Sequence, residues 1–221
     1  MSDFATARRR MVETQLLARG VSDPEVLRAL GRVPRHLFVD EAFADRAYGD
    51  GALPIGHGQT ISQPLMVATM TEALQLEGSE KVLEVGTGSG YQTAVLAEIA
   101  ERVFSVERVA ALYRRARALL DRLGYHRVVL QHGDGTLGWR DHAPYDAIVV
   151  TAGAPHVPAA LRDQLVEGGR LVIPVGGRHQ QNLVRITRRE GGDRSETLGG
   201  CLFVSLVGSD GWPAEAGGDR P

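Results

Sequence analysis

The stretch that decides the fold is Lys81-Val82-Leu83-Glu84-Val85-Gly86-Thr87-Gly88-Ser89-Gly90. Its first half is a short, mostly apolar run, which is typical of a strand buried on both faces. Its second half places three glycines where that strand would turn into the helix that follows. Glycine lets a backbone approach a ligand closely, and the first turn of a helix offers free N–H groups. The stretch therefore predicts a strand, a ligand-binding loop and a helix; a tight turn without a ligand is the alternative.

Toward the C-terminus, short β-branched runs alternate with amphipathic helical segments. Strands that are apolar throughout are buried on both faces, and helices between them imply a parallel sheet, so we expect a doubly wound α/β fold. Two further strands, 182–187 and 198–207, have only a polar loop between them and predict an antiparallel hairpin at the sheet edge. The core strands are expected at 81–85, 103–106, 128–130, 147–150 and 171–173, with helices at 92–102 and 109–123.

The first third of the chain has the pattern of helices joined by short breakers. Gly20 is placed to end the first helix in a left-handed conformation, and Asp23 and Pro24 suit the N-cap and first position of the second. Periodicity disappears from Asp45 to Gln63, a glycine-rich stretch too long for a simple connection, so we expect a functional loop there. A third helix is predicted from Pro64.

The chain is expected to form one domain made of four parts. Its 221 residues match the usual size of a single core. The parts are the N-terminal helices and glycine-rich loop (1–78), the alternating core (79–180), the edge strands (181–208) and a tail rich in Gly, Asp and Pro (209–221), which is predicted to be disordered.

Composition excludes several classes of function. The 25 basic and 27 acidic residues give a formal net charge of −2, which provides no general attraction to nucleic acid or to an anionic membrane. The single cysteine, Cys201, cannot form an internal disulfide, and the seven scattered histidines lack metal-ligand spacing, so we expect no metal. No apolar run approaches the ~20 residues of a membrane span, and no signal-peptide core follows Met1. We therefore expect a soluble cytoplasmic protein without nucleic-acid or membrane partners.

The glycine spacing indicates which ligand the loop binds. G-x-G-x-G differs from the dinucleotide fingerprint G-x-G-x-x-G, so the loop fits a nicotinamide cofactor poorly. An acidic residue before a G-x-G-x-G loop resembles motif I of S-adenosylmethionine (AdoMet) methyltransferases. Glu107 ends the next strand about 20 residues later, where a doubly wound fold places the carboxylate that accepts from ribose hydroxyls. Asp134 follows the third strand, where it would either accept from an adenine amino group or form an Asx-turn.

Methyl transfer restricts the choice of acceptor. The sulfonium leaves as a neutral thioether, so no acid is needed, and a base is needed only when the acceptor carries a proton. The loop Thr151-Ala152-Gly153-Ala154-Pro155 lacks the Asn/Asp-Pro-Pro-aromatic sequence common in nucleobase-amine methyltransferases. A carboxylate acceptor is already ionised at pH 7 and needs only positioning. Thr60 and Ser62 are candidate donors to such a carboxylate, and the alternative for Ser62 is a helix N-cap alone.

Further strings run through nearly the whole chain. The most uncommon is Gly58-Gln59-Thr60-Ile61-Ser62-Gln63-Pro64, and others are Arg10-Met11-Val12, Val33-Pro34-Arg35, Leu53-Pro54-Ile55-Gly56, Ser105-Val106-Glu107-Arg108, Gly133-Asp134-Gly135, Tyr145-Asp146-Ala147-Ile148 and Gly168-Gly169-Arg170-Leu171. Together they resemble the protein-L-isoaspartate(D-aspartate) O-methyltransferase family. The resemblance implies methyl transfer from AdoMet, with S-adenosyl-L-homocysteine as product, to the α-carboxylate of L-isoaspartyl residues in damaged proteins and peptides. The ester then closes to a succinimide, which water opens partly to normal aspartate.

The resemblance also implies roles for particular residues. Ser62 would be the active-site serine. The chain departs from the family at Ser205, where the family strand Phe-Val-Pro-Leu has proline, and at Gly153, where the family has alanine. The AdoMet site would comprise Thr60, Ile61, Gly86, Thr87, Gly88, Ser89, Gly90, Glu107, Arg108, Asp134 and Gly135, and the substrate contacts would be Thr60, Ser62, Val204, Ser205 and Val207.

Two other classes of function stay open. The helix after Glu107 is rich in arginine, which would suit an AdoMet-dependent methyltransferase of RNA or of a small molecule, although the same residues fit a solvated helix face. The other class is a non-catalytic AdoMet-binding module. The intact Thr60-Ile61-Ser62 string favours an active enzyme, which we expect to be a monomer.

Overall fold

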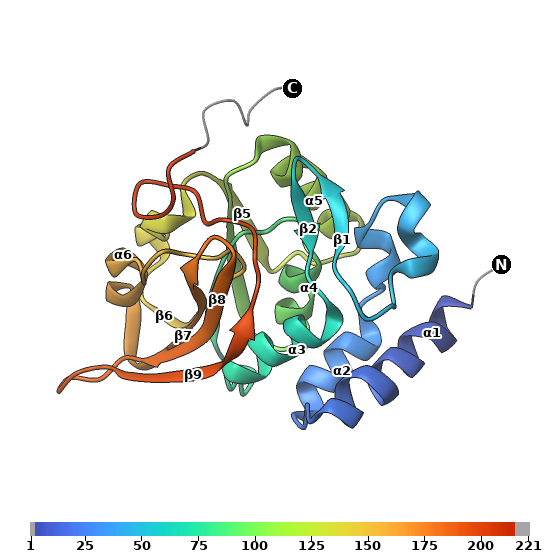
Figure 1. Cartoon of the computed structure of the whole chain (residues 1–221), viewed down its shortest axis with the longest axis horizontal. Helices are drawn as coiled ribbons and strands as arrows, with labels where there is room; N and C mark the ends of the chain where they lie inside the picture. The colour runs from blue at the N-terminus through green and yellow to red at the C-terminus, as the bar shows by residue number, and fades with distance from the viewer. Residues whose placement is uncertain (1–2, 215–221) are drawn as a thin grey trace.

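Five neighbouring parallel strands make up most of a seven-stranded sheet in the computed structural model, which describes residues 3–214 (Figure 1). The order across the sheet is β5-β4-β3-β6-β7-β8-β9, and β8 pairs antiparallel with both β7 and β9. This order confirms the predicted doubly wound α/β fold with an antiparallel edge. The strands are β3 (Lys81–Val85), β4 (Arg102–Glu107), β5 (Val128–His132), β6 (Tyr145–Val150), β7 (Leu165–Gly177), β8 (Gln180–Thr187) and β9 (Arg194–Cys201).

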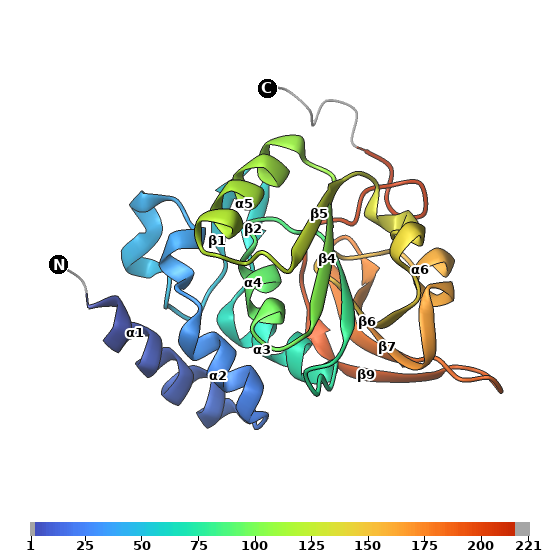
Figure 2. The ribbon, with the colours of Figure 1, turned by 180° about the vertical axis from the view of Figure 1, so that it is seen from behind.

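Helices cover both faces of the sheet (Figure 2). Successive strand residues point to opposite faces, so Val82 packs with the larger helical layer and Leu83 packs with the layer that contains α6. Among residues 3–214, no helix is both long and apolar enough to cross a membrane. The larger layer contains α1 (Phe4–Met11), α2 (Pro24–Arg32), α3 (Pro64–Ala73), α4 (Tyr91–Ala97) and α5 (Ala110–Arg122), and the other contains α6 (Ala159–Asp163).

Local sequence signals set the ends of the N-terminal helices. Gly20, at φ +94°, ends the first helical segment as predicted. The Asp23 carboxylate accepts from the backbone N–H groups of Glu25 and Val26, and Pro24 opens α2, so that prediction is also confirmed. The short turns are η1 (Val12–Leu16), η2 (Leu17–Arg19), η3 (Arg35–Phe38), η4 (Glu41–Arg46), η5 (Gly135–Leu137) and η6 (Arg140–His142).

The glycine-rich segment 45–63 contains a hairpin that the sequence did not predict. β1 (Leu53–Gly56) and β2 (Gln59–Ile61) pair antiparallel. Figure 1 shows this hairpin beside α5, and the Arg115 guanidinium donates to the Ile55 carbonyl at 3.5 Å. Strands of three or four residues interrupted by proline and glycine are too short to show a period-two pattern, so the segment has the composition of a loop.

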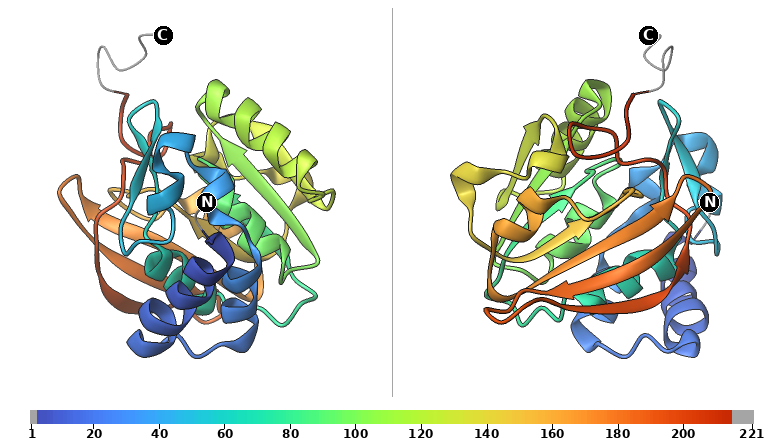
Figure 3. Two further views of the ribbon diagram at one scale, coloured as in Figure 1. Left: turned by 90° about the vertical axis from the view of Figure 1, so that its right-hand side faces the viewer. Right: turned by 60° about the vertical axis from the view of Figure 1, so that its left-hand side comes forward.

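The outermost strand is displaced from its predicted position. The sequence predicted 198–207, whereas β9 occupies Arg194–Cys201 at the edge of the sheet (Figure 3). An edge strand has one neighbour and stays largely exposed, so its sequence is polar. Arg185 and Glu196 stand opposite each other in β8 and β9 and form an ion pair. Residues 202–207 leave the sheet and run toward the loop after β6.

The tail is packed as far as Trp212, which corrects the prediction of disorder from residue 209 onward. The Ser209 N–H donates to the Asp134 carboxylate at 2.7 Å, and the Trp212 indole donates to the Gly153 carbonyl at 3.1 Å. These contacts join residues far apart in the chain, so composition did not indicate them. Residues 215–221, the end of the predicted tail, lie outside the described residues.

Candidate active site

A cavity opens at the carboxyl end of the parallel strands, where β3 lies between β4 and β6. In a doubly wound sheet the connections on either side of this point run in opposite directions, which creates a crevice for ligands. The cavity is a crevice that is open to solvent rather than an enclosed chamber. Its walls come from residues 59–62, from the ends of these strands and from residues 204–207.

The loop between β3 and α4 lines the cavity with backbone. Gly86 has φ +99°, and a Cβ atom there would collide with the Thr151 hydroxyl. That hydroxyl donates to the Gly86 carbonyl at 2.6 Å. Only glycine combines this φ with so close an approach, so the loop presents peptide groups rather than side chains at this point.

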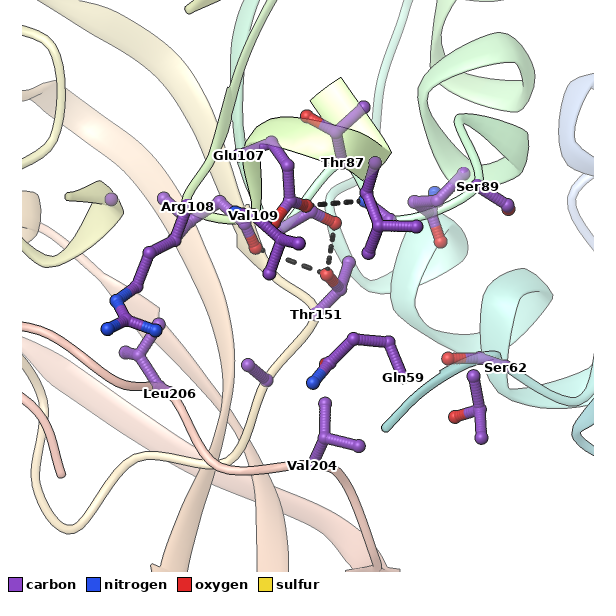
Figure 4. A pocket seen from close by; sticks show the side chains of 18 of the residues that line it. Gln59, Ser62, Thr87, Ser89, Glu107, Arg108, Val109, Thr151, Val204 and Leu206 are labelled. Carbon is purple, nitrogen blue, oxygen red and sulfur yellow. Dashed lines mark hydrogen bonds between the residues drawn. The ribbon is translucent and has the colours of Figure 1, made fainter. Parts of the chain in front are cut away.

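The Glu107 carboxylate is held by backbone N–H groups on both sides, and Figure 4 shows the bond from the glycine loop. One oxygen accepts from Gly88 at 2.7 Å and the other from Val109 at 2.8 Å. The side chain is only 6% exposed. Each carboxylate oxygen has a further lone pair, so the group can still accept from a ligand with two adjacent hydroxyls.

A second acid, Glu84, lies behind the glycine loop and is fully buried. Its Oε2 accepts from the hydroxyls of Thr93 and Ser105, and the Ser105 hydroxyl also bonds to that of Thr87. Burial raises the pKa of Glu84 to about 8, although the two hydroxyl donors act in the opposite direction. With this raised pKa, Glu84 is mostly neutral at pH 7. It does not line the cavity, and its role is to support the glycine loop from behind.

Ser62 faces the cavity from the segment after β2, and its hydroxyl is directed inward (Figure 4). The N-cap of α3 is Gln63, and no side chain forms a cap hydrogen bond there. The interpretation of Ser62 as a helix N-cap is therefore wrong. Among residues 3–214 no hydrogen bond uses the Ser62 hydroxyl, whereas its carbonyl accepts from the Arg35 guanidinium at 2.7 Å.

The structure brings most of the predicted site residues to this one cavity. Gly90 is an exception, because it forms the left-handed N-cap of α4 at φ +86° and packs against Leu120 of α5. The predicted residues that line the cavity are Thr60, Ile61, Ser62, Gly86, Thr87, Gly88, Ser89, Glu107, Arg108, Gly135, Val204, Ser205 and Val207.

Asp134 is the other exception, because its carboxylate is turned to the chain's own backbone. It accepts from the N–H and hydroxyl of Thr136 and from the N–H of Ser209. Burial acts to raise the pKa of Asp134, but these hydrogen bonds outweigh it and lower the pKa. The Asx-turn that the sequence left open is thus present, and Gly135 rather than Asp134 lines the cavity.

Several lining residues were missed by sequence analysis. Thr151 directly follows β6, so the rule that ligands bind at the carboxyl ends of strands would have found it. Val109 and Leu112 lie three positions apart and form one face at the start of α5. The others have no such signal, because the wall of a pocket resembles core in a sequence; they are Gln59, Val67, Met70, Val85, Tyr91, Gln92, Val106, Ala152 and Leu206.

The residues present fit AdoMet. The backbone at Gly86 is open to a ligand, the anchored carboxylate of Glu107 suits a ribose, and Val109 and Leu112 offer an apolar surface to a base. Fold and cavity together define an AdoMet-dependent methyltransferase of the Rossmann-like class.

Comparison with known sequences identifies the family. The family model for protein-L-isoaspartate(D-aspartate) O-methyltransferase matches residues 7–211. The protein-L-isoaspartate O-methyltransferase of Syntrophus aciditrophicus is 59% identical over 215 residues, which cover 96% of this chain and 99% of that protein. The protein of the same name from Geobacter metallireducens is 58% identical over 214 residues, with the same coverage of 96% and 99%. The chain belongs to the protein-L-isoaspartate(D-aspartate) O-methyltransferase family.

Solved structures agree with this assignment. One named protein-L-isoaspartate O-methyltransferase superposes with a TM-score of 0.85 at 29% identity, covering 92% of this chain and 67% of that one. Another, described as a beta-aspartate methyltransferase from Plasmodium falciparum in complex with S-adenosyl-L-homocysteine, gives a TM-score of 0.77 at 28% identity, covering 90% and 98%. The family, the enzyme class and AdoMet as methyl donor, all expected from the sequence, are confirmed.

Proposed function

We propose that this cavity joins a bound AdoMet to the α-carboxylate of an L-isoaspartyl residue, with the glycine loop and Glu107 holding the cofactor and Ser62 holding the carboxylate. When bound, AdoMet supplies a methyl group on a positively charged sulfur. The observation that carries the proposal is the Ser62 hydroxyl, which lies in the same cavity as Glu107 and has no hydrogen-bond partner among the described residues.

In this proposal Ser62 and Thr60 position the substrate carboxylate and transfer no proton. A carboxylate is ionised at neutral pH, so it can attack without a base. The Ser62 hydroxyl would donate to one carboxylate oxygen and leave the other free, and the exposed Thr60 would supply a second hydroxyl nearby. None of the described residues that line the cavity is a histidine, which suits a reaction without a general base.

Residues 204–207 are the proposed wall for the damaged peptide. Their backbone is fixed to the loop after β6, since Gly153 donates to the Val204 carbonyl at 2.7 Å and Leu206 donates to the Gly153 carbonyl at 2.8 Å. An isoaspartyl residue has an extra methylene in its backbone and carries its α-carboxylate as a side group. A fixed wall opposite Ser62 would therefore select for backbone geometry.

The substrates we propose are proteins and peptides, methylated by a monomer in the cytoplasm without nucleic-acid or membrane partners. The formal charge of −2 and the single cysteine support this. Arginines of α5 are used within the fold, since Arg115 donates to Ile55 and Arg117 pairs with Asp121 at 2.9 Å. No observation favours the alternative of an RNA or small-molecule methyltransferase.

The role of Ser62 is tested by Ser62→Ala. Because the hydroxyl caps no helix, we expect the melting temperature to stay unchanged, and because it does not hold the cofactor, S-adenosyl-L-homocysteine affinity should also be kept. The turnover number with an isoaspartyl peptide should fall by about 10- to 100-fold, the value of a hydrogen bond to a charged group. Calorimetry measures the melting temperature and the S-adenosyl-L-homocysteine affinity, and a methyl-transfer assay measures turnover. Unchanged turnover would remove Ser62 from the proposed mechanism.

A further inference from the structure

We infer that Arg35 is a positioning residue for methyl transfer, because its guanidinium fixes the backbone of Ser62 and closes the base of the hairpin that leads to it. The inference rests on the proposed role of Ser62. Arg35 belongs to η3, far from the cavity in sequence, and its side chain is 0% exposed.

The guanidinium bonds to both ends of the hairpin segment. Its Nε donates to the Ala47 carbonyl at 2.7 Å, and its Nη2 donates to the Ser62 carbonyl at 2.7 Å. Ala47 precedes β1 and Ser62 follows β2, so one side chain joins the two ends. The same guanidinium lies over the ring of Tyr91, 4.7 Å from its centre. Tyr91 is the first residue of α4, directly after the glycine loop, so Arg35 joins the Ser62 segment to the cofactor side of the cavity.

This arrangement is costly for a side chain that serves packing alone. Among residues 3–214 no carboxylate lies within ion-pair distance of Arg35, and burying a charged group without one costs several kcal/mol. Nη1 of Arg35 and the phenol oxygen of Tyr91 have no hydrogen-bond partner of ordinary geometry within the same part of the chain. An apolar side chain would avoid the burial of a charge but would leave the two carbonyls without donors, so the contribution of Arg35 lies in the two carbonyls that it holds.

The direction of these bonds matters for Ser62. Arg35 holds the carbonyl of Ser62 and not its hydroxyl, so the hydroxyl stays available to the cavity. Releasing the carbonyl would let Ser62 shift relative to the glycine loop, and a displacement of about 1 Å can reduce turnover about 100-fold. Lysine cannot replace the fork of N–H groups, because a single ammonium does not match two carbonyls in that geometry.

Arg170 provides a matched control for a merely structural role. Its guanidinium also bonds two backbone carbonyls, those of Leu74 at 2.7 Å and Gln75 at 3.1 Å, and it does not line the cavity. We would compare Arg35→Lys with Arg170→Lys by melting temperature, S-adenosyl-L-homocysteine affinity, and kcat and KM for an isoaspartyl peptide. Both variants should lose stability, and only Arg35→Lys should lose about 30-fold in kcat with cofactor affinity kept. Equal kcat values for the two variants would overturn the inference.

A double variant tests whether Arg35 acts through Ser62. If it does, Arg35→Lys in the Ser62→Ala background should lower kcat little further, because residues that act as a unit are not additive. Losses that multiply would overturn the inference while leaving Ser62 in its role. Full turnover by Ser62→Ala alone would instead show that the proposed function of Ser62 is wrong, and the inference would fall with it. If Arg35→Lys does not fold, Arg35→Gln, which keeps one amide donor, takes its place in the same comparisons.

Discussion

One carboxylate oxygen of Glu107 accepts a hydrogen bond from the backbone N–H of Gly88 at 2.7 Å, which ties the end of β4 to the glycine loop after β3. The other oxygen is fixed by Val109. A ligand that bonds to this carboxylate therefore meets a group whose orientation is already set, and little side-chain entropy remains to be lost on binding.

Glu107→Gln should weaken binding of S-adenosyl-L-homocysteine. The glutamine amide nitrogen would replace one of the two carboxylate oxygens. A donor would then face the N–H group of Gly88 or Val109, where the wild type has an acceptor. We expect affinity to fall by about 10- to 100-fold, the value of one or two hydrogen bonds to a charged group. Titration calorimetry measures it, with the exposed Glu101→Gln as control. Equal affinities for the two variants would contradict the role of Glu107.

The stability of the protein should depend on the protonation of Glu84. Its pKa is raised from 4.5 to about 8 by burial, so the folded state binds a proton that the unfolded state has released between these values. The stabilisation is complete below pH 4.5 and is lost as the pH rises through about 8, with a slope of at most about 1.4 kcal/mol per pH unit.

Glu84→Gln should remove that dependence. Glutamine keeps an oxygen for the Thr93 and Ser105 hydroxyls and cannot ionise. Free energies of unfolding in urea, measured from about pH 6 to about pH 8.5, should fall for the wild type relative to the variant. Parallel curves would show that Glu84 titrates near its ordinary pKa.

Gly135→Ala should destabilise the protein by about 1–3 kcal/mol, because a Cβ at this position would collide with a methyl group of Val85. Gly133→Ala is the matched control, since nothing lies within 4 Å of the equivalent position. Adding Val85→Ala to Gly135→Ala should make room for the new methyl group, and the two losses should then be less than additive. Urea unfolding measures these three variants and Val85→Ala alone; equal losses at the two glycines would contradict the packing.

Ser205→Pro, which restores the family residue, should keep methyl-transfer activity. Within the described residues, the bridge to Gly153 uses the N–H groups of Gly153 and Leu206 and leaves that of Ser205 unused. Proline then removes no backbone bond, and only the 3.2 Å bond from Arg178 to the Ser205 hydroxyl is lost. We expect stability to change by less than about 1 kcal/mol.

Leu206→Pro is the matched control for that substitution. It removes the N–H that donates to the Gly153 carbonyl at 2.8 Å, so it should lower both the melting temperature and activity. If Ser205→Pro does the same, the wall of the cavity depends on Ser205 in a way that its backbone bonds do not explain.

The fold was predictable where local chemistry decides the structure. The buried strand 81–85 is mostly apolar because helices cover both of its faces, and the cap at Asp23 needs only neighbouring N–H groups. The glycine loop and Glu107 followed as well, because the carboxyl ends of parallel strands meet at one edge. The resemblance to the family, and not this rule, indicated Ile61, Arg108 and the wall at 204–207.

Other features depend on partners distant in the chain. β9 is polar because it pairs on one side only, and the β1–β2 hairpin is too short for a pattern. Asp134 could not be assigned from sequence, because its partner Ser209 lies 75 positions away. Arg35 is charged and would be expected at the surface, yet it is fully buried against carbonyls that no local signal places beside it.

The most direct test of the account is methyl transfer from labelled AdoMet to two synthetic peptides that differ only in carrying L-isoaspartate or L-aspartate at one position. The proposal is that Ser62 binds the α-carboxylate of an isoaspartyl residue, which is a side group on a backbone with an extra methylene. We predict base-labile label on the isoaspartyl peptide alone. Equal labelling of both peptides, or no label on either despite measurable AdoMet binding, would contradict the account.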